Sequence, residues 1–180
     1  MEITREEAAQ LLEEYVTDEY QRLHSRMVAH VMEKFALSRG EDGKLWYLAG
    51  LLHDLDFTKY PDEHPQKELE WFKSWGYPED FIHAVAAHGH SLNGVEPQTL
   101  MAKALLSVDE LCGFLHAYSL MRPEGFSGMS PSKAAKKFKD KSFAAKIDRE
   151  EVNYGVEKLG VPIEEHFGFV IKALQSFDSA

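Results

Sequence analysis

Residues that start and stop helices recur at short intervals along the chain, and this punctuation constrains the fold more than any other feature. Thr4 and Glu7 form a capping-box pattern, and Asp148 with Glu151 repeats it late in the chain. Gly40 follows an amphipathic segment at a position typical of a helix end. No convincing alternation of apolar and polar residues indicates strands. The sequence therefore predicts an all-α fold, a compact helical bundle.

Caps, prolines and glycines together locate the expected helices. The expected ranges are about 5–16, 19–36, 43–54, 65–75, 78–88 and 97–119, followed by helices that begin near 130, 148 and 162. Residues 121–130 are expected to form a loop. We expect a single domain over residues 1–180, with a motif-bearing core at about 20–120 and C-terminal helices at 130–180 packed on it.

The charge of the chain limits its partners. The formal net charge is −10, which argues against a binder of nucleic-acid duplexes or anionic membranes, because both surfaces require positive charge. One segment, 122–149, is rich in lysine and arginine and could attract a small anionic substrate. The oligomeric state is left open by the sequence.

Cysteine content and the N-terminus bear on location. Cys112 is the single cysteine, so an internal disulfide and a thiolate zinc cluster are both excluded. The first residues, MEITREEAAQ, lack the features of a secretory signal, and no apolar run reaches membrane-spanning length. We expect a cytoplasmic protein.

His24 is the first candidate for a metal ligand. It falls near the centre of an apolar stripe that includes Leu23, Met27 and Val31 on the expected second helix. A buried imidazole needs a hydrogen-bond partner or a metal. A core histidine bonded to a carbonyl is the ordinary alternative.

A second candidate is the pair His53 and Asp54, which ends a helix that is apolar all round. Imidazole and carboxylate are both ligands for divalent ions, and burial of Asp54 without a cation would be costly. The His-Asp dipeptide is common in proteins, so by itself it is weak evidence for a metal site. Asp56 follows closely.

Asp109 is the third candidate. Lys103, Ser107 and Glu110 are expected to form the solvent face of the long helix, which puts Asp109 on the other side among apolar residues. An acid in that position must be protonated, paired with an arginine, or bound to metal. His116 lies two turns further on and could contact substrate or be a polar core residue.

Further histidines follow the His-Asp pair. His88 shares the inward face of its expected helix, whereas His64 follows a turn. His90 lies just past a helix end beside Gly89 and could turn either way. His166 is expected to be an ordinary surface or partly buried residue.

These candidates occur in an order that resembles a known family. The stretches RLHSRMVAHVMEKFA, AGLLHDLDF, DEHP, IHAVAAHGH and LLSVDEL resemble the successive motifs of the HD-domain metal-dependent phosphohydrolases. The resemblance covers roughly residues 20–120. Within the superfamily, the chain looks like the small single-domain bacterial hydrolases, in which the HD motif continues as HDLD before an EH turn.

The resemblance implies a set of metal ligands. The family's metal-binding residues correspond to His24, His53, Asp54 and Asp109, with His53 and Asp54 at the catalytic centre. Dinuclear members add histidines that correspond to His64 and His88. The second residue of their tandem histidine pair falls at Gly89, and His90 could substitute for it. The implied cofactor is a divalent ion: manganese, iron, magnesium, nickel or zinc.

The implied activity is hydrolysis of a phosphomonoester or phosphodiester of a nucleotide or a related small molecule by metal-activated water. In the mechanism of the family that the chain resembles, Asp54 or Asp56 could accept a proton from the attacking water. With one metal, His64 or His88 could instead hold phosphate. Arg122, Lys137 and His116 are candidate substrate contacts, although lysines of this segment could equally form a solvated helix face.

Three other functions stay open at this point. The same pocket could belong to a non-catalytic module that binds or senses a nucleotide. The histidines could be structural in a helical interaction protein. A di-iron oxygenase would require a complete second metal site, which the glycine at position 89 argues against.

Overall fold

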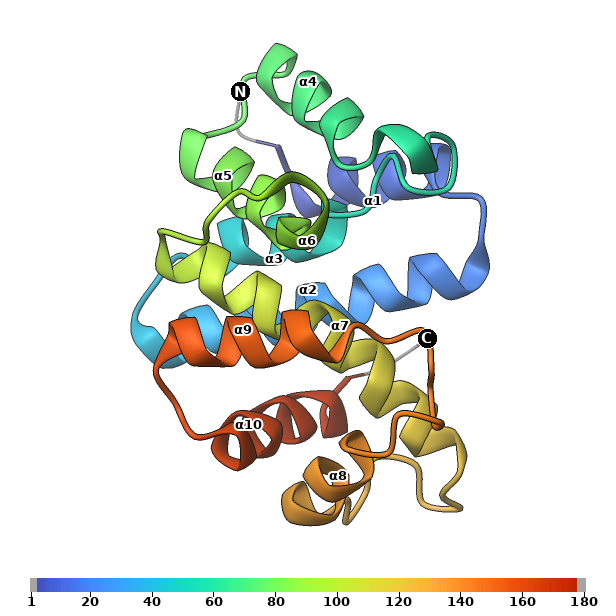
Figure 1. Cartoon of the computed structure of the whole chain (residues 1–180). Coiled ribbons are helices and arrows are strands. Elements are labelled where there is room, and N and C mark those ends of the chain that lie inside the picture. Colours follow the sequence, from blue (N-terminus) through green and yellow to red (C-terminus); the bar gives the residue numbers. More distant parts are fainter. Residues whose placement is uncertain (1–2, 178–180) are drawn as a thin grey trace.

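The computed structural model describes residues 3–177, and two helices of 21 residues each, α2 (Glu19–Arg39) and α7 (Leu100–Leu120), run through the middle of the molecule. They contact each other directly. α3 (Gly43–Leu52) packs on α2, whereas α5 (Glu79–His88) and α9 (Arg149–Leu159) pack on α7. Figure 1 shows α1, α4 and α5 above this centre, with α8 and α10 below it.

All the regular structure in the described residues is helical, so the predicted fold class is confirmed. The nine expected helices all occur in the expected order within the described residues, and η1 and the short α6 were not expected. The remaining elements are α1 (Arg5–Tyr15), the 3-10 helix η1 (Pro61–Glu63), α4 (Gln66–Ser74), α6 (His90–Asn93), α8 (Pro131–Phe138) and α10 (Ile163–Gln175).

Helix ends follow the capping chemistry. The Thr4 hydroxyl accepts a hydrogen bond from the Glu7 N–H, and the Glu7 carboxylate accepts one from the Thr4 N–H, which completes the capping box of α1. Gly40 ends α2 with φ of 75°, a left-handed conformation that glycine adopts without strain. The long helix was expected near residue 97, but it begins at Leu100 because the Thr99 hydroxyl caps it through the Ala102 N–H.

Gly50 lets α2 and α3 approach closely. A Cβ atom at this position would lie 2.7 Å from the Ala29 Cα and 2.8 Å from the Ala29 nitrogen. Since backbone atoms cannot move aside, only glycine fits. The close approach brings the end of α3, with His53 and Asp54, beside His24 on α2.

Gly155 has the same role between α7 and α9. Its Cβ position lies 2.6 Å from the Ser107 nitrogen, so α9 crosses directly over Ser107. The expectation that Ser107 and Glu110 lie on a solvent face is therefore wrong: Ser107 is fully buried and Glu110 faces a cavity. His166 was also misplaced, because it is buried and donates to the Ser107 carbonyl at 3.1 Å.

The C-terminal helices pack against the two long helices. α10 contacts both α2 and α8, and α8 also contacts α7. Residues 1, 2 and 178–180 of the expected domain lie outside the described residues. Within residues 3–177, no helix combines the length and the apolar character needed to cross a membrane.

Candidate metal centre

Four side chains from three helical segments meet at one point. His24 lies on α2, His53 and Asp54 at the end of α3, and Asp109 on α7. The Asp109 Oδ1 atom lies 2.7 Å from His24 Nε2 and 3.2 Å from His53 Nε2. His53 Nε2 also lies 3.3 Å from Asp54 Oδ2. One ligand atom from each residue lies within 4.8 Å of all the others, a spacing that suits a single ion.

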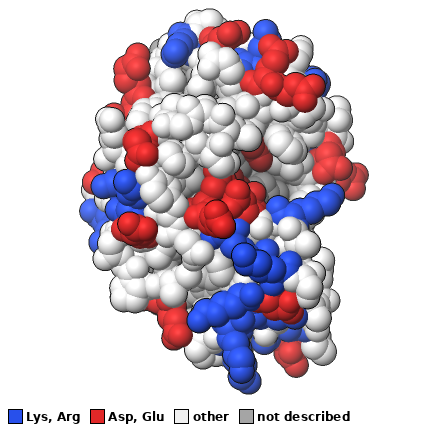
Figure 2. Space-filling model, in the orientation of Figure 1, with Lys and Arg blue, Asp and Glu red and all other residues white. Residues whose placement is uncertain are grey.

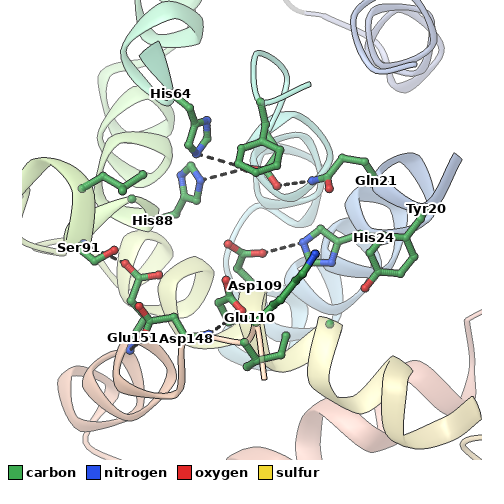
Figure 3. A pocket seen from close by; sticks show the side chains of 17 residues that line it. Tyr20, Gln21, His24, His64, His88, Ser91, Asp109, Glu110, Asp148 and Glu151 are labelled. Carbon is green, nitrogen blue, oxygen red and sulfur yellow. Dashed lines mark hydrogen bonds and ion pairs between the residues drawn. The ribbon is translucent and has the colours of Figure 1, made fainter. Parts of the chain in front are cut away.

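Asp54 extends this group to a second one. Its other oxygen, Oδ1, lies 3.4 Å from His88 Nε2 and 3.5 Å from His64 Nε2. In Figure 3, His64 and His88 lie together on one side of the pocket and His24 lies on the other. Asp54, His64 and His88 form a second set of potential ligands. The two oxygens of one carboxylate therefore face two histidine groups.

Gly89 borders this second group and leaves it with three protein side chains. A Cβ at Gly89 would lie 3.2 Å from Pro65 Cγ, which is tighter than ordinary contact. The expected second member of a tandem histidine pair therefore has little room at this position.

A buried acid pair orients His64. Asp56 Oδ1 accepts from His64 Nδ1 at 2.6 Å, which leaves Nε2 directed at Asp54. Asp56 is itself held by Glu68, since its Oδ2 accepts from the Glu68 N–H at 2.9 Å. Carboxylates that fix a ligand histidine in this way are typical of metal sites. Asp56 is fully buried, and each of its carboxylate oxygens already accepts a hydrogen bond. It is therefore poorly suited to accept a proton from water as a general base.

Main-chain carbonyls orient two other imidazoles. His53 Nδ1 donates to the Gly50 carbonyl at 2.9 Å, and His88 Nδ1 donates to the Val85 carbonyl. Each bond fixes the ring so that Nε2 points into the group of acids. The local helical turn therefore sets the ligand geometry.

The electrostatics of the centre favour a cation. Burial would raise the pKa of Asp54 and Asp109, but the neighbouring histidines hold both pKa values well below the usual range. Burial likewise opposes the charge of His53, yet Asp54 and Asp109 raise its pKa well above normal. In residues 3–177 the ion-pair partners of both aspartates are histidines. A divalent ion could replace the protons that the converging Nε2 atoms otherwise carry, so the donor set fits a metal.

The centre forms the floor of a cavity of about 430 Å³. This volume falls in the usual range for sites that bind small molecules. Tyr20 and Phe57 line the cavity, as does Glu110, whose pKa burial and Asp109 raise to about 8. A small ligand could therefore reach Asp54, His64, His88 and Asp109 from solvent.

Comparison with protein families gives one match. The sequence model of the HD domain matches residues 23–112, which is half of the chain. The chain belongs to the HD-domain family. This family is a phosphohydrolase superfamily, and its members are typically metal-dependent. No curated protein and no solved structure gave a significant match.

His90 of this HD domain does not join the centre. Its Nδ1 donates to the Val95 carbonyl at 3.0 Å, and its ring stacks on Tyr154 with centroids 4.7 Å apart. The chain turns at Gly89 and begins α6 with His90, which directs the ring toward α9. The idea that His90 substitutes for the missing histidine is therefore wrong.

The three expected substrate contacts also lie elsewhere. Arg122 donates to the carbonyls of Gly125 and Ser127 and so fastens the loop after α7. Lys137 is paired with Asp140 at 2.8 Å. His116 is half-buried and its ring packs at a tilt against that of Tyr20, with centroids 5.7 Å apart, so it supports a cavity-lining residue without lining the cavity itself.

Several residues of the site were missed from the sequence. Gln21 lies one helical turn before His24 and donates to Asp54 Oδ2. The i, i+3 spacing from His24 was a usable signal for it. Glu68 had no such signal, because its carboxylate meets Asp56 only after the chain has folded back. Lys146 and Glu151 reach the cavity from a segment distant in sequence.

Proposed function

We propose that this HD domain is a metal-dependent phosphohydrolase that cleaves a phosphomonoester or phosphodiester of a nucleotide or related small molecule. One observation carries the proposal: the two oxygens of Asp54 face two separate histidine groups at the floor of an open cavity. Pairs of metal ions bridged in this manner are typical of phosphoester hydrolysis.

In this proposal, His24, His53, Asp54 and Asp109 would hold one divalent ion, and Asp54, His64 and His88 would hold a second. When bound, the ions lower the pKa of water and neutralise charge on the phosphoryl group. Manganese, iron, magnesium, nickel and zinc all suit mixed nitrogen and oxygen ligands. Gln21 holds Asp54 at Oδ2, and Asp56 holds His64, so both positions are fixed before substrate arrives.

The reaction is balanced by water alone. The oxygen of water forms a new bond to phosphorus, the bond from phosphorus to the alcohol oxygen breaks, and the departing alcohol takes a proton derived from that water. His53 and Asp54 are the residues that we assign to the catalytic centre. Phe57 and Leu92 contribute apolar surface to the lining of the cavity.

The test uses purified protein loaded with Mn²⁺ and assayed on p-nitrophenyl phosphate, bis(p-nitrophenyl) phosphate and a panel of nucleotides. We expect turnover that disappears with a chelator and returns with Mn²⁺. His88→Ala and Asp54→Asn should each lower kcat by about 100-fold or more. His83→Ala is the matched control on the same helix. His83 lies outside the cavity, where its Nε2 accepts a hydrogen bond from the Gln98 N–H.

A non-catalytic nucleotide sensor is the alternative. It predicts a higher melting temperature on addition of a nucleotide without hydrolysis of any member of the panel. Full activity of Asp54→Asn would contradict the proposed hydrolase directly.

A further inference from the structure

One wall of the cavity comes from outside the segment that matches the HD domain. The match ends at residue 112, whereas Lys146, Ile147 and Asp148 line the cavity from the loop before α9 and Glu151 lines it from α9. In Figure 3, Asp148 and Glu151 lie below His88, close to Ser91. This wall therefore belongs to this chain and not to the shared motif.

The wall is fixed in place by buried hydrogen bonds. The Arg149 side chain is buried and donates to a series of main-chain carbonyls, those of Phe138, Asp140, Phe143, Ala144 and Ile147. The Asp148 N–H donates to Glu110 Oε2 at 3.1 Å, and the Ser91 N–H donates to Glu151 Oε1 at 2.9 Å. A wall held at so many points is suited to select between ligands.

The charge of the wall is mainly negative. Lys146 is the one lysine or arginine among the residues that line the cavity, whereas Asp148 and Glu151 both line it from the same wall. Figure 2 shows acidic side chains gathered near the middle of the displayed face, with lysine and arginine side chains directly below them. With divalent ions bound, the floor would suit an anion, whereas the wall suits a donor of hydrogen bonds.

Each wall carboxylate keeps one oxygen for a ligand. Asp148 Oδ1 accepts from the Glu150 and Glu151 N–H groups, and Glu151 Oε1 accepts from Ser91. For Asp148 Oδ2 and Glu151 Oε2, the described part of the chain contains no hydrogen-bond partner. A carboxylate oxygen accepts strongly from an ammonium or hydroxyl group.

We propose that the substrate is a monophosphate ester whose alcohol part carries an ammonium or hydroxyl group, and that Glu151 and Asp148 accept hydrogen bonds from that group. The inference rests on the proposed function, because it assumes that the phosphate lies on the metal-binding floor. Lys146 offers one positive charge to a phosphate oxygen. A triphosphate would bring further negative charges against the two carboxylates, so polyphosphates are disfavoured.

Binding of phosphonates tests the recognition without any turnover. The probes are 3-aminopropylphosphonate, 3-hydroxypropylphosphonate and propylphosphonate, which differ only in the terminal group and contain no cleavable phosphoester. Calorimetry with Mn²⁺-loaded protein should give a dissociation constant about 10-fold lower for an amino or hydroxy probe than for propylphosphonate, as expected for one charge-assisted hydrogen bond.

Two isosteric variants locate the effect. Glu151→Gln keeps an oxygen for the Ser91 N–H but removes the charge, and it should reduce the preference to about 2-fold or less. Glu150→Gln is the matched control, because Glu150 is the exposed neighbour on the same helix and is not part of the cavity wall. We expect it to keep the wild-type preference. Equal binding of all three probes, or an unchanged preference in Glu151→Gln, would overturn the inference.

Turnover separates this inference from the proposed function. Wild-type kcat/KM should be about 10-fold higher for 2-aminoethyl or 2-hydroxyethyl phosphate than for ethyl phosphate, and higher for AMP than for ATP. Metal-dependent turnover without these preferences would overturn the inference alone. Selective phosphonate binding with no turnover of any phosphoester would overturn the hydrolase and leave the recognition standing.

Discussion

The Asp109 Oδ1 atom lies 2.7 Å from His24 Nε2, although 85 positions separate the two residues in the sequence. The contact forms because α2 and α7 cross at this point, and it puts a partly buried carboxylate beside two imidazoles. Asp109 is therefore the residue through which α7 contributes to the candidate metal centre.

Asp109→Asn removes the negative charge at this crossing. We expect the affinity for Mn²⁺ to fall by about 10-fold or more, because a neutral amide is a weaker ligand and no longer balances the cation. Calorimetric titration of chelator-treated protein measures the change. Asp80→Asn, an exposed acid in the first turn of α5, should bind as wild type does. Equal affinities of the two variants would remove Asp109 from the ligand set.

Asp56→Asn tests the residue that orients His64. The asparagine can still accept from His64 Nδ1 but offers an N–H group where Glu68 needs an acceptor, so the imidazole loses its fixed position. We expect the affinity for the ion at the Asp54, His64 and His88 group to fall by about 10- to 100-fold. A two-site Mn²⁺ titration measures it, with exposed Asp62→Asn as the control. A loss confined to the other ion would contradict this assignment.

Gly50→Ala tests the approach of α2 and α3. The added methyl would lie 2.7 Å from the Ala29 Cα, so the helices must separate, at a cost of about 3 kcal/mol in the free energy of unfolding. Gly168→Ala on α10 is the matched helical control, because its nearest neighbour, Pro131 Cγ, lies at an ordinary 3.5 Å. Urea unfolding should give a neutral or stabilising effect there. Equal stability of both variants would contradict the tight α2–α3 contact.

His166 should make stability depend on pH. Burial lowers the pKa of His166 to about 4, despite the bond to the Ser107 carbonyl, whereas in the unfolded chain it is about 6.5. Between these values the unfolded state binds more protons, so stability falls as pH falls. From pH 7 to pH 5 the residue should cost about 2 kcal/mol.

Urea unfolding of chelator-treated protein at both pH values measures this effect. His166→Gln keeps an N–H donor but does not titrate, so its loss between pH 7 and pH 5 should be smaller by about 2 kcal/mol. An identical loss in wild type and variant would show that His166 is not the group responsible.

Local signals made the fold predictable. Thr4, Gly40 and Ser130 each act through bonds to residues within a few positions, so the helices and most of their ends could be read from the sequence. It was harder to predict which face of a helix is exposed to solvent, because another helix can cover a polar face. Ser107 has polar neighbours at helical spacing, but Gly155 lies against it only in the folded chain.

The candidate site divides in the same way. His24, His53, Asp54 and Asp109 carried a pattern of spacing, and the structure brings them together; their role as ligands stays a prediction. His90 is a suitable residue type for a metal ligand, but its side chain does not point to the metal centre, because the turn at Gly89 directs it to Tyr154. The cavity wall formed by Asp148 and Glu151 could not be predicted, because nothing in the sequence of the loop before α9 indicates where that loop packs.

The sharing of Asp54 between two cations is the central claim, and an anomalous diffraction map at the manganese edge tests it most directly. Crystals grown with Mn²⁺ should show two peaks, one among His24, His53, Asp54 and Asp109 and one among Asp54, His64 and His88. Two ions bridged by a carboxylate typically lie about 3.5–4 Å apart. A map with a single peak at Asp54, or with peaks only at residues outside these two groups, would contradict the account.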